Sequence, residues 1–346
     1  ALEAYNKTLS IKPDYADAFS NMGLILKDRG KFDEAIDAYN KALSLKPNNA
    51  VIYNNIGNVL EVQGKLDEAI EFYNKSIALK PDLADAHKNL SLILIKSGKL
   101  KEGLDKFEWR WRTNKFLSQQ RNFSQPFWDG KKSLNGKRIL VWCEQGIGDT
   151  LNWSSCLSLV TSKAKYCILE CQEKLVPLLK RSFPNIEVNS ENKSSDLERN
   201  DFDFHLPMGS IYKHFINKIE QNTNIDAYLI PDPVRVNFWK ERLNSLGNGP
   251  YIGVCWKSAH IDIKRRPNYV PISELYPILK LPNVTYVNLQ YTDFTNDLTK
   301  IKKEFGVTIH NFNDLDHINN IDDVAALCSA LDMVVSTKTT VPLISA

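Results

Sequence analysis

A turn with two glycines and an acidic residue stands between an apolar run, 138–143, and a helical pattern. It reads Glu144, Gln145, Gly146, Ile147, Gly148, Asp149, Thr150. Glycines permit a tight turn whose backbone N–H groups are exposed where a helix begins. Asp149 is a candidate general base, and the alternative is that it only caps the helix. The turn lacks the third glycine of a dinucleotide-binding motif and the Lys-Ser/Thr pair of a P-loop.

A basic loop follows a second apolar run, 251–256. Its polar side chains are Lys257, Ser258, His260, Lys264, Arg265 and Arg266. Ligands of open α/β sheets bind at the carboxyl ends of the strands, so we expect an anionic ligand at this loop. Arginine and lysine pair well with a diphosphate and stabilise a departing phosphate. The alternative is a solvated basic loop.

A third segment, 332–340, ends in a turn that carries the hydroxyl groups of Thr337, Thr339 and Thr340. The turn follows a strand pattern and precedes a further helix. Hydroxyl and N–H groups at the start of a helix suit a phosphate or a sugar.

Alternating strands and helices must position these three segments. Short β-rich apolar runs lie at 138–143, 166–171, 202–208, 251–256, 285–290, 307–312 and 333–337. Helical patterns lie at about 149–162, 172–182, 233–246, 272–280, 295–305 and 321–331. This alternation predicts parallel sheets with helical crossovers. We expect one Rossmann-like lobe at 137–232, a linker helix at 233–249 and a second lobe at 250–346.

A repeat of 34 residues fills the chain before these lobes. The segment 31–48, KFDEAIDAYNKALSLKPN, nearly recurs at 65–82 as KLDEAIEFYNKSIALKPD. The period and the residue types resemble the tetratricopeptide-repeat (TPR) family, whose helix pairs stack into a solenoid that holds peptide-like partners. We expect a TPR array at 1–112. It divides into a half repeat at 1–14, full repeats at 16–49 and 50–83, and a degenerate repeat at 84–112.

Asparagines are expected along the inner helices of this array, at Asn21, Asn54, Asn55 and Asn89. Their amides are suited to hydrogen bonds with an extended peptide, and the alternative is that they are solvated polar positions. A Trp-rich junction follows at 113–136. It is expected to pack against both neighbours as a structural wedge, and the alternative is that it contacts the substrate.

Composition places the chain among ordinary globular proteins. Apolar residues make up 43% and charged residues 25%, and the formal net charge is +3. No clustered basic face predicts nucleic-acid binding, and no apolar run approaches the length of a membrane span. Six cysteines lack the C-x-x-C spacing, which favours reduced buried thiols and a cytoplasmic protein.

The order of the motifs resembles bacterial TPR-containing glycosyltransferases. These are related to glycosyltransferase family 9, which includes the lipopolysaccharide heptosyltransferases, and more loosely to protein O-GlcNAc transferase. The motifs are EQGIGDTLNWSS at 144–155, GVCWKSAH at 253–260 followed by RRP, NLQ at 288–290 and DDVAALCSALDMVVST at 322–337. The resemblance covers essentially the whole chain. It implies a GT-B fold of two lobes, with the acceptor side first, and an inverting reaction in the cleft without a metal or a cofactor.

That resemblance also implies roles for single residues. Asp149 would activate the acceptor hydroxyl, and the acceptor-side loop would be Glu144, Gln145, Gly146 and Gly148. The nucleotide-sugar donor would bind to Lys257, Ser258, His260, Arg265, Arg266, Gln290, Thr337, Thr339 and Thr340. The acceptor would be a protein or a glycan. The TPR array is expected to present a protein or peptide-like acceptor to the cleft.

Two residues depart from the family pattern: Lys338 stands at the usual Asp position and Pro342 at the usual His position. They motivate the alternative of a non-catalytic TPR scaffold with a degenerate transferase fold. A nucleotide-dependent oxidoreductase is a weaker alternative, because the glycine motif is incomplete. The chain begins within a repeat and stops inside a helix, so we expect a fragment with an incomplete donor lobe.

Overall fold

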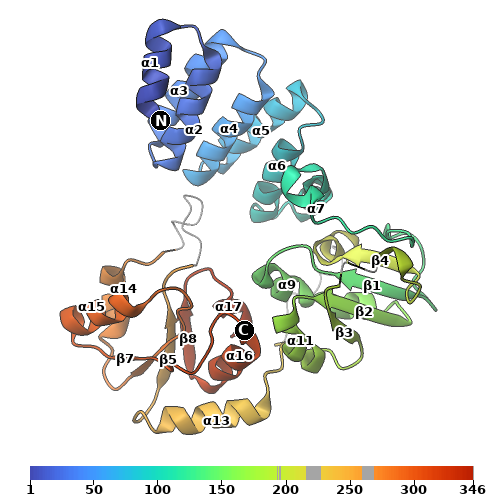
Figure 1. Cartoon of the computed structure of the whole chain (residues 1–346), viewed down its shortest axis with the longest axis vertical. Coiled ribbons are helices and arrows are strands. Elements are labelled where there is room, and N and C mark those ends of the chain that lie inside the picture. The colour runs from blue at the N-terminus through green and yellow to red at the C-terminus, as the bar shows by residue number, and fades with distance from the viewer. Residues whose placement is uncertain (193, 195, 216–226, 259–268, 346) are drawn as a thin grey trace. The chain divides into compact units, whose positions relative to one another are not determined.

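The computed structural model describes residues 1–345 except 193, 195, 216–226 and 259–268. The described residues divide into two compact units, one of residues 1–120 and one that begins at Arg121. The first unit is helical, and the second contains two parallel sheets (Figure 1).

The first unit is a stack of antiparallel helix pairs. Its helices are α1 (Leu2–Ile11), α2 (Ala16–Asp28), α3 (Phe32–Leu45), α4 (Ala50–Val62), α5 (Leu66–Leu79), α6 (Ala84–Lys96), α7 (Leu100–Phe107), the 3₁₀ turn η1 (Glu108–Arg112) and α8 (Asn114–Leu117). Helix α2 packs on α3, α4 on α5, and α6 on α7. One apolar core runs through the pairs. The predicted helical solenoid is therefore confirmed.

In each full helix pair, a glycine of the first helix faces a tyrosine ring of the second. A Cβ atom built on Gly23 would lie 2.7 Å from Cε1 of Tyr39, and one built on Gly57 would lie 2.7 Å from Cε1 of Tyr73. Both tyrosines are fully buried. The glycines are therefore needed for the close approach of the two helices, as the repeat pattern predicts.

We expect Gly57→Ala to destabilise the array by about 1–3 kcal/mol, because the added methyl group must displace the buried ring of Tyr73. Urea unfolding of residues 1–120, followed by the helical circular dichroism signal, measures this loss. Gly57→Ala combined with Tyr73→Leu removes the ring and should recover the part of the loss that is due to the clash. A Gly57→Ala chain as stable as the wild type would contradict the close-packing argument.

The first sheet belongs to the lobe that follows the array. Its strands are β1 (Arg138–Trp142), β2 (Tyr166–Cys171), β3 (Glu187–Ser190) and β4 (Phe204–Pro207), all parallel, in the order β3-β2-β1-β4. Around them lie α9 (Ile147–Ser154), α10 (Leu157–Thr161), η2 (Glu173–Leu175), α11 (Val176–Ser182), η3 (Asp196–Glu198) and η4 (Met208–Ser210). The predicted helix at 149–162 is therefore two helices, and strand β3 was not predicted.

The second sheet has the same topology. Its strands are β5 (Tyr251–Cys255), β6 (Thr285–Asn288), β7 (Ile309–His310) and β8 (Met333–Ser336), all parallel, in the order β7-β6-β5-β8. The connecting helices are α14 (Ile272–Leu279), α15 (Thr295–Phe305), α16 (Ile321–Ala330) and α17 (Val341–Ile344). The predicted parallel sheets are confirmed in both regions.

A linker helix, α13 (Pro233–Asn244), packs along α16. Asp232 caps its first turn by accepting hydrogen bonds from the backbone N–H groups of Val234 and Arg235. Arg235 forms a two-pronged ion pair with Asp323 of α16, at 2.8 Å for both bonds. Trp239 Nε1 donates to the same carboxylate at 2.7 Å. The linker is thus fixed to α16 by a partly exposed ion pair and one buried hydrogen bond.

The Trp-rich junction divides between the two units. In the first unit, Phe116 is buried and lies edge-on to Trp111, with ring centroids 5.7 Å apart. In the second, Trp128 is buried and its Nε1 donates to the backbone oxygen of Lys132 at 2.8 Å. Each half of the junction therefore packs against its own neighbour.

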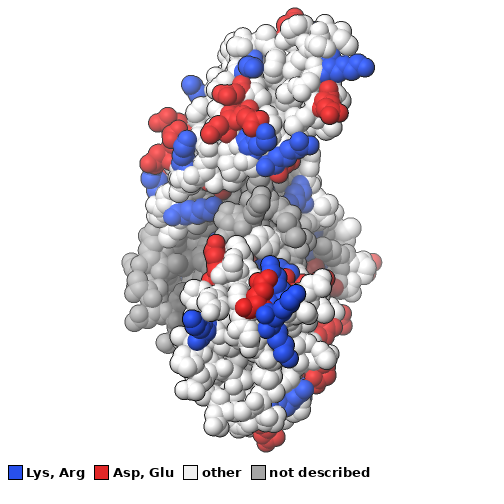
Figure 2. Space-filling model, turned by 90° about the vertical axis from the view of Figure 1, so that its left-hand side faces the viewer, with Lys and Arg blue, Asp and Glu red and all other residues white. Residues whose placement is uncertain are grey.

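Charges of both signs are interspersed on the face that Figure 2 shows, and the described side chains there form no extended basic patch. No helix among the described residues is long and apolar enough to cross a membrane.

Candidate functional site

The turn after β1 leads directly into α9. Gly146 is the N-cap residue of this helix, and Asp149 lies exposed in its first turn. The alternative that Asp149 caps the helix is therefore wrong. A Cβ atom built on Gly146 would lie 3.7 Å from Oδ2 of Asp149, so the carboxylate lies over the glycine turn. An exposed carboxylate in that place is accessible to a bound hydroxyl group.

The other side chains of this turn hold it in place. Glu144 is buried, and its Oε1 accepts a hydrogen bond from the backbone N–H of Gly209 at 3.2 Å. Gln172, which follows β2, donates to the backbone oxygen of Gln145 at 2.8 Å and accepts from the hydroxyl of Thr150 at 3.1 Å. Gln172 thus clamps both ends of the turn, a role that sequence reasoning missed.

The loop after β5 is organised by one buried amide. Oε1 of Gln290 accepts from the backbone N–H groups of Trp256 at 3.1 Å and Lys257 at 3.0 Å. Its Nε2 donates to the backbone oxygen of Lys257 at 2.8 Å and to Thr292 Oγ1 at 2.7 Å. The Gln290 side chain is fully buried. Both N–H groups and the oxygen of this amide are hydrogen-bonded within the protein. The structure therefore contradicts the prediction that Gln290 contacts the nucleotide sugar, and Gln290 instead supports the loop.

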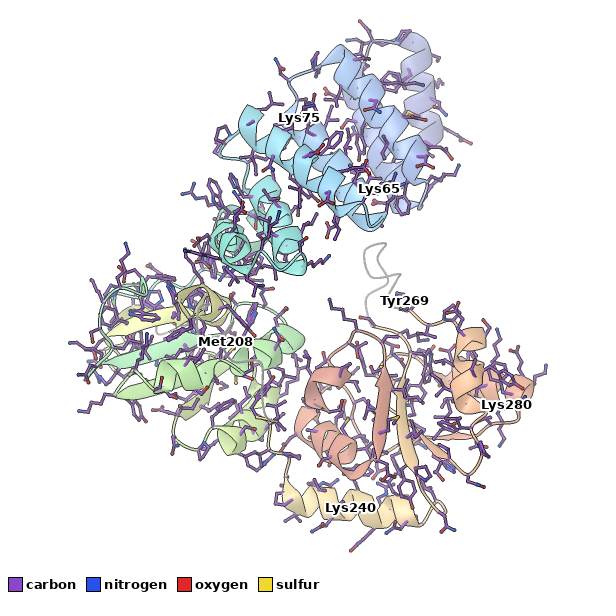
Figure 3. All side chains as sticks on the ribbon, turned by 180° about the vertical axis from the view of Figure 1, so that it is seen from behind. Lys65, Lys75, Met208, Lys240, Tyr269 and Lys280 are labelled. Carbon is purple, nitrogen blue, oxygen red and sulfur yellow. The ribbon has the colours of Figure 1, made fainter. Side chains whose placement is uncertain are left out.

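Lys257 points toward the first turn of α15. Its Nζ lies 2.6 Å from Oδ2 of Asp297, which also accepts from Trp256 Nε1 at 2.9 Å. The lysine side chain keeps 26% of its exposure, so a second anion can approach it. Asp297 was not singled out from the sequence, because nothing in its helical pattern marks it. The backbone oxygen of Ser258 accepts a hydrogen bond from the hydroxyl of Tyr269, 3.2 Å away. Tyr269 is labelled in Figure 3.

The hydroxyl-rich turn follows β8. Thr337 N donates to the backbone oxygen of Cys255 at 2.9 Å, which joins this turn to the end of β5. Thr339 Oγ1 accepts from Val341 N at 3.2 Å at the start of α17. Thr337 Oγ1 is buried without a hydrogen-bond partner among the described residues. Lys338 is exposed, and Pro342 occupies the first turn of α17, where proline is well tolerated.

The acidic turn at 144–150 contacts the hydroxyl-rich turn at 337–340, and the basic loop begins beside the hydroxyl-rich turn. A Cβ atom built on Gly148 would lie 3.4 Å from Thr340 Oγ1. Strand β5 pairs with β8, so Lys257 and Thr337 follow neighbouring strands at the same sheet edge. The structure thus brings together the acidic turn, the hydroxyl-rich turn and the start of the basic loop.

A cavity of about 120 Å³ adjoins this meeting point. Its walls come from both sheet regions and include Ile147, Lys174, His317 and Thr340. Lys174 Nζ donates to the backbone oxygen of Ile318 at 3.0 Å across the cavity wall. Arg181 forms an ion pair with Asp322 beside it. These contacts hold the two sheet regions together around the cavity.

Several predicted residues remain outside this description. His260, Arg265 and Arg266 lie outside the described residues, as does Lys264. Among the side chains that the structure does describe, no group of three or more His, Cys, Asp or Glu is arranged to hold a metal ion.

The asparagines of the array are in different environments. Asn54 is buried, and its Oδ1 accepts from Asn89 Nδ2 at 3.0 Å, which joins α4 to α6. Asn21 is exposed and Asn55 is half-buried. Asn54 therefore contributes to the stacking of repeats, and Asn21 and Asn55 keep exposed surface for a ligand.

Comparisons with known proteins agree with the helical repeats. Models described as "TPR repeat" and "Tetratricopeptide repeat" match residues 23–64 and 50–83. The chain therefore contains tetratricopeptide repeats, which typically form protein-interaction scaffolds. A curated relative, Protein FlbA of Caulobacter vibrioides, is 32% identical over 240 residues, which are 65% of this chain and 40% of that protein. This chain thus spans less than half of FlbA.

Solved structures resemble part of the chain. MamA is 24% identical with a TM-score of 0.30, over 34% of this chain and 69% of MamA. YrrB, described as a TPR protein with an unusual peptide-binding site, is 25% identical with a TM-score of 0.31, over 33% of this chain and 59% of YrrB.

Proposed function

We propose that this chain is a glycosyltransferase, which moves a sugar from a nucleotide-sugar donor to an acceptor hydroxyl through a GT-B arrangement of its two sheet regions. The observation that carries the proposal is the contact between Gly148 and Thr340. A Cβ atom built on Gly148 would lie 3.4 Å from Thr340 Oγ1. This contact supports the proposal because Gly148 directly precedes the exposed Asp149, and Thr340 belongs to the turn that we propose binds phosphate. Base and donor site are the two components that sugar transfer needs.

The roles follow from the surroundings of each side chain. Asp149 is the general base, because it is exposed in the first turn of α9 over a glycine turn. Lys257 and the 337–340 turn hold the donor diphosphate, since a lysine ammonium and helix-start N–H groups both bind phosphate. Gln290 positions the loop after β5 and does not touch the donor. Asp297 holds Lys257 until a phosphate replaces it as partner.

The array is proposed to bind a protein that carries the acceptor hydroxyl, and no metal or cofactor is invoked. A second candidate is a non-catalytic scaffold, in which the array binds partners and the sheets only support it. The observation that favours the scaffold is Lys338, an exposed cation where the resembled family has an acid. Binding of a nucleoside diphosphate distinguishes the two functions, because a transferase must bind the nucleotide of its donor and a scaffold is not expected to bind one.

Lys257→Met tests the donor site. We expect titration calorimetry to show a nucleoside diphosphate binding roughly tenfold to a hundredfold more weakly to this variant, because a charge-assisted hydrogen bond to phosphate is lost. The matched control is Lys240→Met on the exposed side of α13 (Figure 3), which should leave the affinity unchanged. Equal weakening by both variants would show only a general effect of charge, and an unchanged affinity in Lys257→Met would remove this lysine from the donor site.

A further inference from the structure

Lys257 and Asp297 form an ion pair at the sheet edge where the donor diphosphate is proposed to bind. The Nζ atom of Lys257 lies 2.6 Å from Oδ2 of Asp297. Both side chains are partly exposed, at 26% for the lysine and 23% for the aspartate. A partly exposed ion pair contributes little net free energy, because water competes for both charges. The pair is therefore weak enough to open when another anion approaches the lysine.

The backbone of Lys257 is fixed next to the hydroxyl-rich turn. Gln290 accepts a hydrogen bond from the N–H of Lys257 at 3.0 Å and donates one to its backbone oxygen at 2.8 Å. The sulfur of Cys255 lies 3.9 Å from that oxygen and 3.8 Å from Thr339 Oγ1. Because lysine has a flexible four-carbon side chain, its ammonium group can reach either Asp297 or an anion on the turn.

Asp297 has other stabilising contacts besides the lysine. Its Oδ2 also accepts a hydrogen bond from Trp256 Nε1 at 2.9 Å. Asp297 lies in the first turn of α15, where the helix dipole favours a negative charge. The carboxylate thus keeps a hydrogen-bond donor and a favourable field when Lys257 turns to another anion, which lowers the cost of opening the ion pair.

We propose that Asp297 competes with the donor diphosphate for Lys257 and so limits how tightly a nucleoside diphosphate binds. Lysine has three N–H donors but one charge, so the carboxylate weakens the attraction between Lys257 and a phosphate whether or not it is fully displaced. When the nucleoside diphosphate leaves, the carboxylate pairs with the lysine again, and the partly buried cation is not left alone. Asp297 therefore promotes release of this product. The inference rests on the proposed function and adds to it a residue that regulates the affinity of the same site.

Titration calorimetry on the full chain tests the proposal with the diphosphates of uridine, cytidine, adenosine and guanosine. Asp297→Asn keeps the shape of the side chain and can accept the hydrogen bond from Trp256, but it removes the negative charge. We expect a nucleoside diphosphate to bind roughly threefold to tenfold more tightly to this variant than to the wild type, because a partly exposed ion pair no longer competes. Damage to the fold would weaken binding, so a gain in affinity is specific to competition.

Three further variants show whether the gain acts through Lys257. Asp297→Asn combined with Lys257→Met should bind no more tightly than Lys257→Met alone, because the cation that the carboxylate competes for is absent. The matched control is Asp293→Asn, which removes the charge of an exposed aspartate four residues earlier. Asp293 Oδ1 accepts from the backbone N–H of Thr295 at 3.3 Å, and an asparagine can accept the same bond, so this control should leave the affinity unchanged. If Asp297→Asn does not fold, Asp297→Ser removes the same charge and should show a gain in the same direction.

The outcomes separate this inference from the proposed function. If no nucleoside diphosphate binds to the wild type, the proposed glycosyltransferase function fails, and the role of Asp297 fails with it. If one binds and the loss of the Asp297 charge leaves its affinity unchanged or lowers it, the inference is overturned while the proposed function stands. A gain that persists without Lys257, or that Asp293→Asn reproduces, would show a general effect of charge and would also overturn the inference.

Discussion

Asp149→Asn is expected to reduce sugar transfer by about 10²- to 10⁴-fold, the usual contribution of a general base. Asparagine has nearly the same shape as aspartate, so the first turn of α9 should be kept. The substitution removes only the ability to accept a proton from the acceptor hydroxyl. The measurement is kcat for release of nucleoside diphosphate from a nucleotide sugar in the presence of acceptor.

A matched variant separates catalysis from structure. Asp129→Asn changes another exposed aspartate of the same unit, whose Oδ1 accepts from the backbone N–H of Lys131 at 2.9 Å. An asparagine can accept the same bond, so this control should keep full activity. The affinity of Asp149→Asn for the nucleoside diphosphate should also match that of the wild type. Undiminished kcat in Asp149→Asn would remove this residue as the base.

Arg121→Met is expected to destabilise the second unit by about 3–5 kcal/mol, the usual loss when one member of a buried ion pair is removed. The Arg121 side chain is 1% exposed and pairs with Glu170 and Asp196. Its Nε lies 2.9 Å from Asp196 Oδ2, and it also donates to the backbone oxygen of Asn192 at 3.1 Å. Methionine fills similar space but leaves the Asp196 carboxylate buried without this partner.

Hydrogen exchange of the amides in β1 and β2 measures this loss locally, because these strands pair beside Glu170. The matched control is Arg138→Met, whose side chain is 44% exposed and lies 3.7 Å from Asp203. An exposed ion pair of that kind contributes at most about 1 kcal/mol. A loss in Arg121→Met no larger than in Arg138→Met would contradict the structural role of the buried network.

The regular elements were predictable where the local pattern was strong. The 34-residue period predicts the helix pairs. Each pair needs a glycine opposite a large side chain, as Gly57 is opposite Tyr73. The strands at β1 and β2 are continuous apolar runs, because both faces of a parallel sheet are covered. Strand β3 was missed since only Val188 of its four residues is buried, which leaves no periodic signal. The split between α9 and α10 carries no proline or glycine to mark it.

The candidate site was predictable only in part. The three segments could be placed at strand ends, and parallel topology then brings Lys257 and Thr337 to one edge. The partners of these residues come from distant elements and have no local signature. Asp297 binds Lys257 from a helix 40 residues away. His317 lines the cavity from a loop in which nothing in the sequence distinguishes it from an ordinary polar residue.

Buried and exposed polar residues also look the same in a sequence. Gln290 was expected to contact a donor, but burial directs its amide to the backbone of the neighbouring loop. Asn54 was expected to contact a peptide, and it instead accepts a hydrogen bond from Asn89 of the next repeat. Whether such a group faces a ligand or the protein depends on tertiary packing.

The most direct test of the proposed function is release of nucleoside diphosphate from a panel of nucleotide sugars by the full chain, assayed with protein and glycan acceptors. We expect at least one donor to be consumed, with a rate that saturates with donor concentration and is lost in Asp149→Asn. If no donor is consumed and no nucleoside diphosphate binds, the chain is a TPR scaffold and the glycosyltransferase proposal is wrong.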